Sequence, residues 1–253
     1  MGYSMAKISL PVSLIVPCFE RFAQTESLLM SLANADFTCQ VILIDDHSSR
    51  PIEPLLSHFQ NLEIVHRRNP VNRGPAISRN IGLEVASHGF VAFTDNDCCV
   101  SPTWLIELHK SLSEAPSPIA GVGGRVLAKG NDIYSRYYDF HKLLDPWYFR
   151  GQYYYITTAN AIYRKHTVQA VKGFDPSVAQ AGGEDPGLCF KLLNLGYAFG
   201  YNQDAIVFHD YAPSLLSFMR NLYRYGYGCY GQSKKHYRSL PFVESTTFGG
   251  MRG

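Results

Sequence analysis

The 253-residue sequence has few features that would tie it to a bilayer or to a disulfide-bonded scaffold. None of its apolar runs approaches the roughly 20 residues that a helix needs to cross a membrane. Its six cysteines lack both the CxxC spacing of a zinc site and the density of a disulfide framework, which suits a reducing compartment. The N-terminus lacks a full apolar core and a clean cleavage site, so we expect no signal peptide and a cytoplasmic protein.

A strong excess of charge of either sign is also missing. Lys and Arg number 23 and Asp and Glu 21, which gives a formal net charge of +2. General nucleic-acid binding usually requires a basic face, so we expect no nucleic-acid partner. Hydrophobic residues make up 46% of the chain and charged residues 17%, the proportions of an ordinary globular protein. One large domain, with at most a small appendage, is expected at this length.

No glycine-rich phosphate loop follows the first apolar run. That run covers residues 12–19, and the segment around its end, PCFERFAQ, contains no glycine. A nucleotidyltransferase would need glycines with Lys or Arg at this place, and a nicotinamide dehydrogenase would need glycines there too. The GVGGR segment at 121–125 comes too late in the chain to serve either enzyme. The sequence therefore disfavours both classes.

Apolar runs and helical patterns alternate along the first half of the chain. Alternation with short connections predicts a mostly parallel sheet with helices on both faces. Continuous apolar runs are typical of strands that are buried on both faces. The predicted strands are 12–19, 40–48, 61–67 and 89–95, and the predicted helices are 20–35, 52–59, 74–86 and 101–112.

The second half is less regular. Its predicted elements are strands at 120–130, 156–165 and 205–211 and a helix at 182–197. Residues 131–155 are rich in aromatics, which can stack on a bound ligand but equally can form core or an interface. The basic aromatic tail at 213–240 could lie on an anionic membrane, cover a binding site or form a dimer contact. Glycines at 226, 228 and 231 argue against one continuous helix there.

Acidic residues gather where the predicted strands end. Asp45 and Asp46 end one strand, and Asp95 and Asp97 end another. Ligands of such sheets bind at the carboxyl ends of the strands. Two carboxylates this close repel each other unless a cation joins them, and a hard divalent cation that grips a diphosphate needs few protein carboxylates. From these residues alone, two alternatives stay open: Asp97 caps the next helix, or Asp45-Asp46 forms an Asx turn with Ser48.

The order of the motifs resembles that of a known family. After the second strand comes DDxS, followed by RGPxxxRNxG, DxD, TAN, a GGED that opens a helix, and a histidine. In this order the chain resembles, over roughly residues 10–212, the family 2 inverting GT-A glycosyltransferases, which use nucleotide sugars. The resemblance implies an α/β fold of the GT-A type, with a mostly parallel Rossmann-like nucleotide-binding sheet flanked by helices and a mixed acceptor-side half.

The resemblance also implies one domain over residues 1–240. Its expected parts are a nucleotide-binding half at 10–115, an acceptor and catalytic half at 116–212, and the helical tail at 213–240. We expect residues 241–253 to form a flexible tail. Through the tail at 213–240, the protein would contact the inner face of a membrane peripherally or form a homodimer.

A donor site follows from the same resemblance. In the family, the loop after the first strand and the second Asp after the second strand hold the nucleotide base. An Asp carboxylate can accept the imide N–H of uracil, and an aromatic ring can stack on the base. The matching residues are Pro17, Phe19, Glu20 and Asp46, with Phe19 or a neighbour as the stacking group.

The helix that begins at Gly74 offers free N–H groups to an anion. Either Arg73 or Arg79 would face the diphosphate or the donor sugar, and we favour Arg79. In the alternative, Arg79 pairs with an acidic neighbour such as Asp95. Further donor contacts are implied for Asp95, Asn96 and Asn160, the last in the TTAN segment that borders the donor sugar.

The metal ligands implied by the resemblance are Asp97, Asp95 and His209. Asp97 would be the principal ligand, and Asp95 would contact ribose or reach the metal through water. An imidazole beside carboxylates favours Mn²⁺ over Mg²⁺, although Mg²⁺ would also serve. The metal would neutralise the charge that develops on the leaving diphosphate.

Inverting transfer needs a base that removes the proton of the acceptor hydroxyl. Asp185 matches the base of the family, with Glu184 positioning acceptor or donor. A place near a helix N-terminus favours the ionised carboxylate. Gly182 and Gly183 would let the backbone approach the sugar closely.

The expected function is therefore metal-dependent inverting transfer of a sugar from a nucleotide diphosphate donor, a UDP-sugar, to an acceptor hydroxyl. The alternative is a degenerate relative that binds a sugar nucleotide or a partner without turnover. Loss of Asp97, Asp185 or His209 would have favoured that alternative, and all three are present.

Overall fold

The computed structural model describes residues 6–178, 181–211 and 214–236, and the statements that follow concern these residues. The strands are β1 (Ile8–Cys18), β2 (Phe37–Asp45), β3 (Glu63–Arg68), β4 (Phe90–Phe93), β5 (Cys98–Val100), β6 (Ile119–Ala128), β7 (Trp147–Phe149), β8 (Gln152–Tyr155), β9 (Ala161–Arg164) and β10 (Ala198–His209). The helices are α1 (Phe22–Ala33), α2 (Glu53–Leu56), α3 (Pro75–Val85), α4 (Trp104–Glu114), α5 (Ile133–His141), α6 (Lys165–Ala170), α7 (Glu184–Asn194) and α8 (Leu215–His236).

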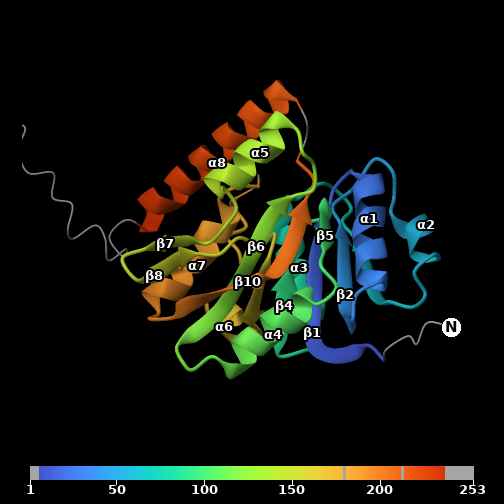
Figure 1. The fold of residues 1–253 in the computed structure, drawn as a ribbon, viewed down its shortest axis with the longest axis horizontal. Helices are drawn as coiled ribbons and strands as arrows, with labels where there is room; N and C mark the ends of the chain where they lie inside the picture. The colour runs from blue at the N-terminus through green and yellow to red at the C-terminus, as the bar shows by residue number, and fades with distance from the viewer. Residues whose placement is uncertain (1–5, 179–180, 212–213, 237–253) are drawn as a thin grey trace, which may run out of the picture.

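An eight-stranded sheet in the order β3-β2-β1-β4-β9-β6-β10-β5 runs through the molecule (Figure 1). In the first half, β1 pairs with β2 and β4 in parallel, and β2 pairs with β3 in parallel. In the second half, β9 is antiparallel to both β4 and β6, and β5 is antiparallel to β10. The predicted combination of a parallel nucleotide half and a mixed second half is confirmed.

Each face of the sheet is covered by its own hydrophobic cluster. Along β1, Leu14 and Val16 point into a cluster that includes residues of α1, α2 and α4. Ile15, between them, points into the other cluster, with residues of α3, α6 and α7. Because successive side chains of a strand point to opposite faces, a continuous apolar run is what such a doubly covered strand needs. Burial on both faces holds the strand ends, and the polar residues that follow them, in fixed positions.

The second half differs from the sequence prediction in several elements. The strand predicted at 156–165 begins only at Ala161, because the backbone turns at 157–160 with Asn160 N donating to Thr157 O. The strand predicted at 205–211 is the last part of the longer β10. The three-residue β5 was not predicted, since it is too short to show a pattern.

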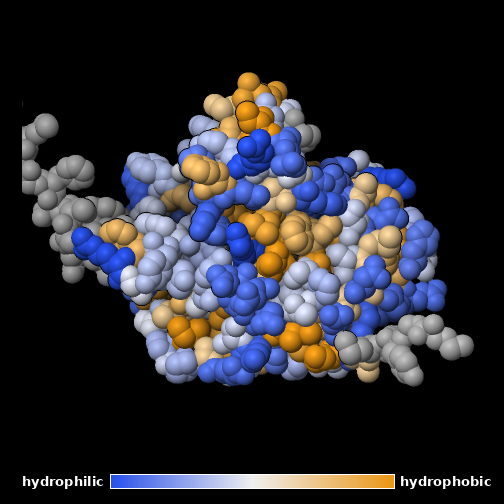
Figure 2. Space-filling model, in the orientation of Figure 1, coloured by the Kyte–Doolittle hydropathy of each residue, from blue (hydrophilic) through white to orange (hydrophobic). Residues whose placement is uncertain are grey.

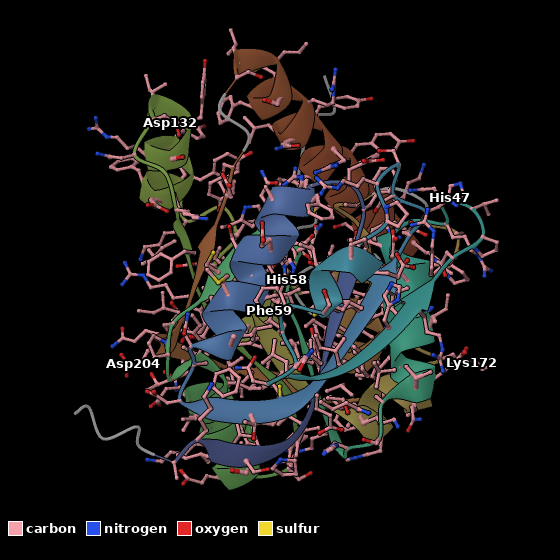
Figure 3. The ribbon with its side chains drawn as sticks, turned by 90° about the vertical axis from the view of Figure 1, so that its right-hand side faces the viewer. His47, His58, Phe59, Asp132, Lys172 and Asp204 are labelled. Atoms are coloured by element: carbon pink, nitrogen blue, oxygen red, sulfur yellow. The ribbon has the colours of Figure 1, made fainter. Side chains whose placement is uncertain are left out.

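The aromatic segment at 131–155 forms a helix and a hairpin, neither of which was assigned from the sequence. Asp132 caps α5, its side chain accepting hydrogen bonds from the N–H groups of Tyr134 and Ser135 (Figure 3). Strands β7 and β8 pair as an antiparallel hairpin outside the main sheet.

The C-terminal helix α8 is continuous, contrary to the expectation from its glycines. It lies along α5 and across α7 (Figure 1). Gly228 has a packing reason: a Cβ there would lie 2.5 Å from the carbonyl of Gly182. The close backbone contact outweighs the poor helix propensity of glycine. The predicted tail at 241–253 lies outside the described residues.

Two observations concern the cysteines and a possible membrane span. All six cysteines are free, as expected from their spacing. Among the residues that the structure describes, no helix has the length and apolar character to cross a membrane.

Candidate active site

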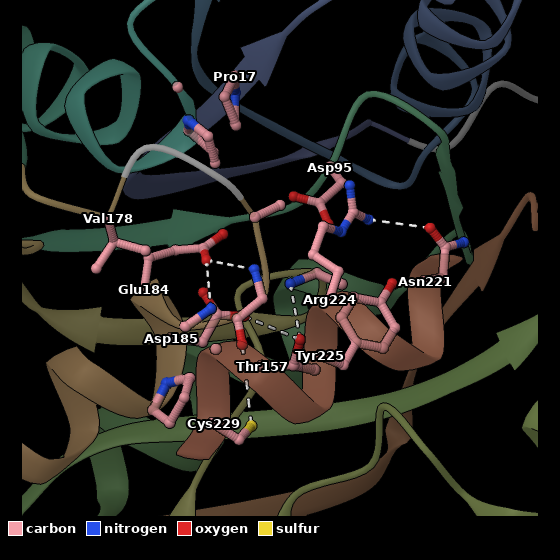
Figure 4. Close-up of a pocket in the computed structure, with 18 of the residues that line it drawn as sticks. Pro17, Asp95, Thr157, Val178, Glu184, Asp185, Asn221, Arg224, Tyr225 and Cys229 are labelled. Atoms are coloured by element: carbon pink, nitrogen blue, oxygen red, sulfur yellow. Dashed lines mark hydrogen bonds between the residues drawn. The ribbon is translucent and has the colours of Figure 1, made fainter. Parts of the chain in front are cut away.

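A cavity of about 990 Å³ lies at the carboxyl ends of the strands, between the sheet and α8 (Figure 4). Its walls come from the end of β1, the start of α3, the segment after β4, the start of α7, the end of β10 and α8. Most residues predicted for the site line it: Pro17, Phe19, Asp46, Arg79, Asp95, Asn96, Asp97, Glu184, Asp185 and His209. The lining does not include Glu20, Arg73 or Asn160.

Asp46 holds the loop that precedes α3. Its carboxylate, 3% exposed as a residue, accepts hydrogen bonds from Asn69 Nδ2 at 2.7 Å, Arg73 N at 2.9 Å and Gly74 N at 2.7 Å. A carboxylate offers about four acceptor positions, so one remains for a ligand. Arg73 thus contributes a backbone N–H to the hydrogen bonds of Asp46. Phe19, at 49% exposure, presents a free ring at the rim of the same cavity.

The Asx-turn alternative holds for Asp45 and not for Asp46. Asp45 Oδ1 accepts from Ser48 N at 2.9 Å, and its other oxygen pairs with Arg68. Asp45 therefore shapes the turn, while Asp46 faces the cavity.

Two consecutive left-handed residues follow β1. Glu20 and Arg21 both have φ of 53°, which is uncommon outside glycine. Glu20 points outward, where its carboxylate accepts from the N–H and hydroxyl of Ser49 and its pKa is lowered by these bonds. Arg21 points inward and forms an ion pair with Asp97. The turn therefore removes Glu20 from the cavity and supplies a cation that the sequence analysis missed.

Arg79 is the centre of a buried carboxylate cluster. Its guanidinium lies 2.7 Å from Asp95 Oδ1, 2.9 Å from Glu184 Oε1 and 3.9 Å from Asp185 Oδ1, and the residue is 2% exposed. Burial disfavours the charged guanidinium, but the three carboxylates outweigh it and raise the pKa of Arg79. The pairing of Arg79 with an acidic neighbour, left open by the sequence, is thus present.

Glu184 is fully engaged inside the protein. Besides Arg79, its carboxylate accepts from Gly182 N at 2.6 Å and Gly183 N at 3.0 Å. Gly182 and Gly183, which were expected to approach a sugar, line the cavity and also pack against α8, since a Cβ on Gly183 would lie 3.1 Å from Gly228. Glu184 therefore fixes the first turn of α7.

Asp185 is held by the TTAN turn, since it accepts from Thr158 Oγ1 at 2.6 Å and Thr158 N at 3.0 Å. Burial, together with the charge of Glu184, raises the pKa of Asp185 to about 7, although Arg79 and Thr158 act in the opposite direction. Burial beside a second carboxylate thus acts against the preference for the ionised form that is expected at a helix N-terminus. Asp185 is therefore poised to accept a proton near neutral pH.

Asp97 and His209 form a second pair of potential ligands in the wall of the cavity. Asp97 Oδ1 lies 3.5 Å from His209 Nε2 and has no hydrogen-bond partner among the described residues, although it is buried. Burial lowers the pKa of His209 to about 4, so its imidazole is neutral, the form that binds a metal. Asp97 does not cap α4, whose N-terminus has no side-chain cap.

The thiol of Cys98 lies within 4.8 Å of the Asp97 and His209 ligand atoms, so these three side chains could group around an ion. Burial raises the pKa of Cys98, which keeps its thiol protonated. A protonated thiol is a poor ligand for Mg²⁺ or Mn²⁺. An unpartnered carboxylate oxygen beside a neutral imidazole fits a divalent cation, with Arg21 neutralising the other oxygen of Asp97.

Asn160 lies in the interior beneath the cavity. Its Nδ2 donates to the carbonyls of Arg125 and Ala205, both at 2.8 Å, and its Oδ1 accepts from Trp104 Nε1 at 2.7 Å. These bonds join β6, the irregular part of β10 and α4. This position agrees with the expected role of Asn160 in ordering the site. The side chain does not line the cavity.

Among the alternatives that the sequence left open for the tail at 213–240 was a cover over the site, and α8 does line the cavity. Arg224 lines it and donates to Asn221 Oδ1 at 3.2 Å, and its buried Nε has no hydrogen-bond partner in the described part of the chain (Figure 4). Arg220, one helical turn earlier, also lines the cavity. Their spacing of four residues was the available signal, since it places both cations on one face of a helix.

Comparison with known sequences gives a family match. The sequence profile described as Glycosyl transferase family 2 matches residues 13–171, more than half of the chain. The pre-mycofactocin glycosyltransferase of Mycobacterium tuberculosis is 28% identical over 225 residues, which cover 85% of this chain and 46% of that protein. The chain thus spans less than half the length of this relative.

Two solved structures share the fold. A mannosyltransferase from Pyrobaculum calidifontis, in complex with GDP-Man and Mn²⁺, matches with a TM-score of 0.73 and 17% identity, covering 95% of this chain and 68% of the other. TarS from S. aureus, in complex with UDP-GlcNAc, matches with a TM-score of 0.62 and 19% identity, covering 82% and 60%. At these identities the likeness shows the fold, and the GT-A prediction is confirmed.

Proposed function

Because the chain belongs to glycosyl transferase family 2, we propose that it transfers a sugar from a nucleotide diphosphate donor to an acceptor hydroxyl with inversion at the anomeric carbon. One observation carries the proposal. The cavity at the strand ends contains an aspartate with a pKa near neutrality, Asp185, and a separate Asp97–His209 pair with an unpartnered carboxylate oxygen. The first suits proton removal and the second suits a metal-bound diphosphate.

Asp185 is the general base in this proposal. It takes the proton of the acceptor hydroxyl while the hydroxyl oxygen forms a bond to the anomeric carbon. The bond from that carbon to the diphosphate oxygen breaks on the opposite face, and its electron pair leaves with the diphosphate. Thr158 orients the carboxylate through two hydrogen bonds. Glu184 and Arg79 hold the base in place from the protein side.

The leaving diphosphate requires positive charge. Asp97 and His209 would hold Mn²⁺ or Mg²⁺, and Asp95 would reach it through water; when bound, the metal would neutralise the departing phosphate oxygens. Arg224 adds a protein cation on the α8 side of the cavity. Its unpartnered Nε supports a role in binding an anionic group.

The donor is proposed to be a UDP-sugar. The remaining acceptor position of Asp46 suits the imide N–H of uracil, and the exposed ring of Phe19 suits stacking on the base. The solved relatives are complexes with GDP-Man and with UDP-GlcNAc, so guanine is the main competitor.

Isothermal titration of UDP, GDP and dTDP, with Mn²⁺ and with EDTA, tests the proposal. We expect Mn²⁺-dependent binding of UDP that is lost in Asp97→Ala. Tight binding of GDP instead would overturn the choice of base and keep the diphosphate site. Absence of binding by a folded protein would overturn the metal–diphosphate site altogether.

Turnover needs a second assay, because a degenerate relative would bind nucleotide without reacting. UDP release from a panel of UDP-sugars should be measurable for the native protein and strongly reduced for Asp185→Asn. Equal UDP release by both proteins would overturn the role of Asp185, and nucleotide binding without UDP release from any donor would favour the degenerate relative.

A further inference from the structure

An exposed apolar stripe runs along α8. Leu216, Met219, Tyr223, Tyr227 and Tyr230 are 68%, 56%, 73%, 69% and 66% exposed. Steps of three and four residues place them on one side of the helix. The opposite side packs on α7, while the stripe is exposed, with Tyr223 and Tyr227 at the edge of the cavity. Large hydrophobic side chains gathered in this way mark a binding surface more often than scattered ones do.

Helix α5 packs beside α8 and adds exposed apolar residues of its own. Phe218 of α8 packs against Tyr134 and Tyr138 of α5, with ring centroids 5.2 and 5.7 Å apart, so the helices lie side by side. Ile133 and Phe140 of α5 are 74% and 82% exposed. We call these exposed residues of both helices the α5–α8 face. Figure 2 shows hydrophobic residues gathered at the tip of the molecule over these helices.

The charge of α8 has one sign. The helix contains Arg220, Arg224, Lys234 and Lys235 and no acidic residue. Arg220 and Lys234 are exposed, while Lys235 pairs with Asp175. Helix α5 adds the exposed Arg136 and one exposed acidic residue, Asp139, so positive charge still exceeds negative charge on the accessible surface of the two helices. The combination of exposed apolar side chains and positive charge is complementary to an anionic surface that also accepts apolar groups.

We propose that the α5–α8 face binds the surface of a lipid bilayer that contains anionic lipid. Tyrosine suits the interfacial region because its ring is apolar and its hydroxyl stays hydrated. The face is a ridge of two helices, which can enter the headgroup region without a matching groove on a partner. Positive charge draws the ridge to anionic headgroups, and the apolar side chains then leave water.

Docking in this way has a consequence for the cavity. Tyr223 and Tyr227 belong to the exposed stripe and also line the cavity. A bilayer against the α5–α8 face would lie at the edge of the cavity. Membrane docking goes beyond the proposed transfer reaction, and it can be measured without any donor or acceptor.

Vesicle co-sedimentation tests the proposal. Vesicles of phosphatidylcholine alone are compared with vesicles that also contain phosphatidylglycerol. We expect binding to the anionic vesicles and a loss of about tenfold or more in partitioning for Leu216→Glu/Met219→Glu. The matched control is Leu195→Glu/Met30→Glu, because these residues are 59% and 56% exposed on other surfaces. Equal loss in both double variants would overturn the assignment to this face.

A charge variant provides a second test that does not disturb apolar packing. Lys234→Gln should weaken binding to anionic vesicles about fivefold, because each cation near the surface contributes about 1 kcal/mol. Lys172, exposed on the side of the molecule away from α5, serves as the control (Figure 3). Lys172→Gln should leave partitioning unchanged, and equal effects of the two variants would contradict the proposal.

A dimer assay separates membrane docking from a protein interface, and nucleotide titration separates it from the proposed function. If the native protein ignores anionic vesicles but forms a dimer that Leu216→Glu/Met219→Glu disrupts, the α5–α8 face is a protein interface and the proposal is wrong. Nucleotide titration of the same double variant should match the native protein, because neither residue lines the cavity. Failure of nucleotide binding in every protein would then concern the proposed function, not docking.

Discussion

The two walls of the cavity are built by different means. One wall consists of polar residues at the ends of parallel strands, such as Asp46 and Asp97, which the buried sheet holds in place. The other consists of the first turn of α7 and the face of α8, which meet through a contact between Gly228 and Gly182. The first wall is fixed by the core of the domain, whereas the second depends on two helices approaching each other closely. In the proposed function, the first wall binds the nucleotide base and the metal, and the second wall provides the general base Asp185.

The largest effect is expected from Asp185→Asn. Amide replacement removes the base while preserving the shape of the side chain, so we expect kcat to fall by about 10²–10⁴-fold. UDP affinity, measured by titration, should stay nearly unchanged because Asp185 belongs to the second wall. An equal loss of UDP affinity in Asp185→Asn would contradict separate roles for the two walls.

Gly228→Ala should damage the second wall alone. The new Cβ would lie 2.5 Å from the Gly182 carbonyl, so we expect a loss of about 2 kcal/mol in the free energy of unfolding, measured in urea. Gly226→Ala is the matched control on the same helix, because a Cβ there meets nothing within 4 Å. That variant should be neutral or more stable by up to about 1 kcal/mol. A Gly228→Ala variant as stable as Gly226→Ala would contradict the close contact as the reason for glycine at 228.

The pH dependence of the reaction should follow Asp185. Because burial and Glu184 raise its pKa to about 7, the carboxylate becomes protonated as the pH falls through that value. Activity should therefore be full above this pKa and decline about tenfold per pH unit well below it. Nucleotide titration over the same range should not show this step. A kcat that stays constant down to the usual pKa of an aspartate would contradict the assignment.

Phe19→Ala should give the smallest effect and should act on the first wall. Loss of a stacked ring at an exposed rim is expected to weaken UDP binding by about 1 kcal/mol, with kcat unchanged at saturating donor. Phe140→Ala is the control, since this exposed ring of α5 does not line the cavity. Equal affinities of the two variants would remove Phe19 from the base site.

The strand ends of the first wall were predicted better from the sequence than the helix α8 of the second wall. Asp95 and Asp97 could be placed at one edge of the sheet because parallel strands end together and their apolar runs are plain in the sequence. By contrast, the continuity of α8 was missed, because glycine lowers helix propensity and only packing against α7 compensates. One error fell on the strand-end wall as well: the direction of Glu20 was missed, since it depends on two residues with φ of 53°.

The sequence by itself determined the α/β fold, the family resemblance and the set of polar residues at the strand ends, because these follow from local periodicity and motif order. Only the tertiary structure decided which groups meet. Arg79 and Glu184 are 105 residues apart in the chain yet form a buried ion pair, and Asp185 takes its raised pKa from that environment. Charge pairing and burial depend on distances in space, which local patterns do not specify.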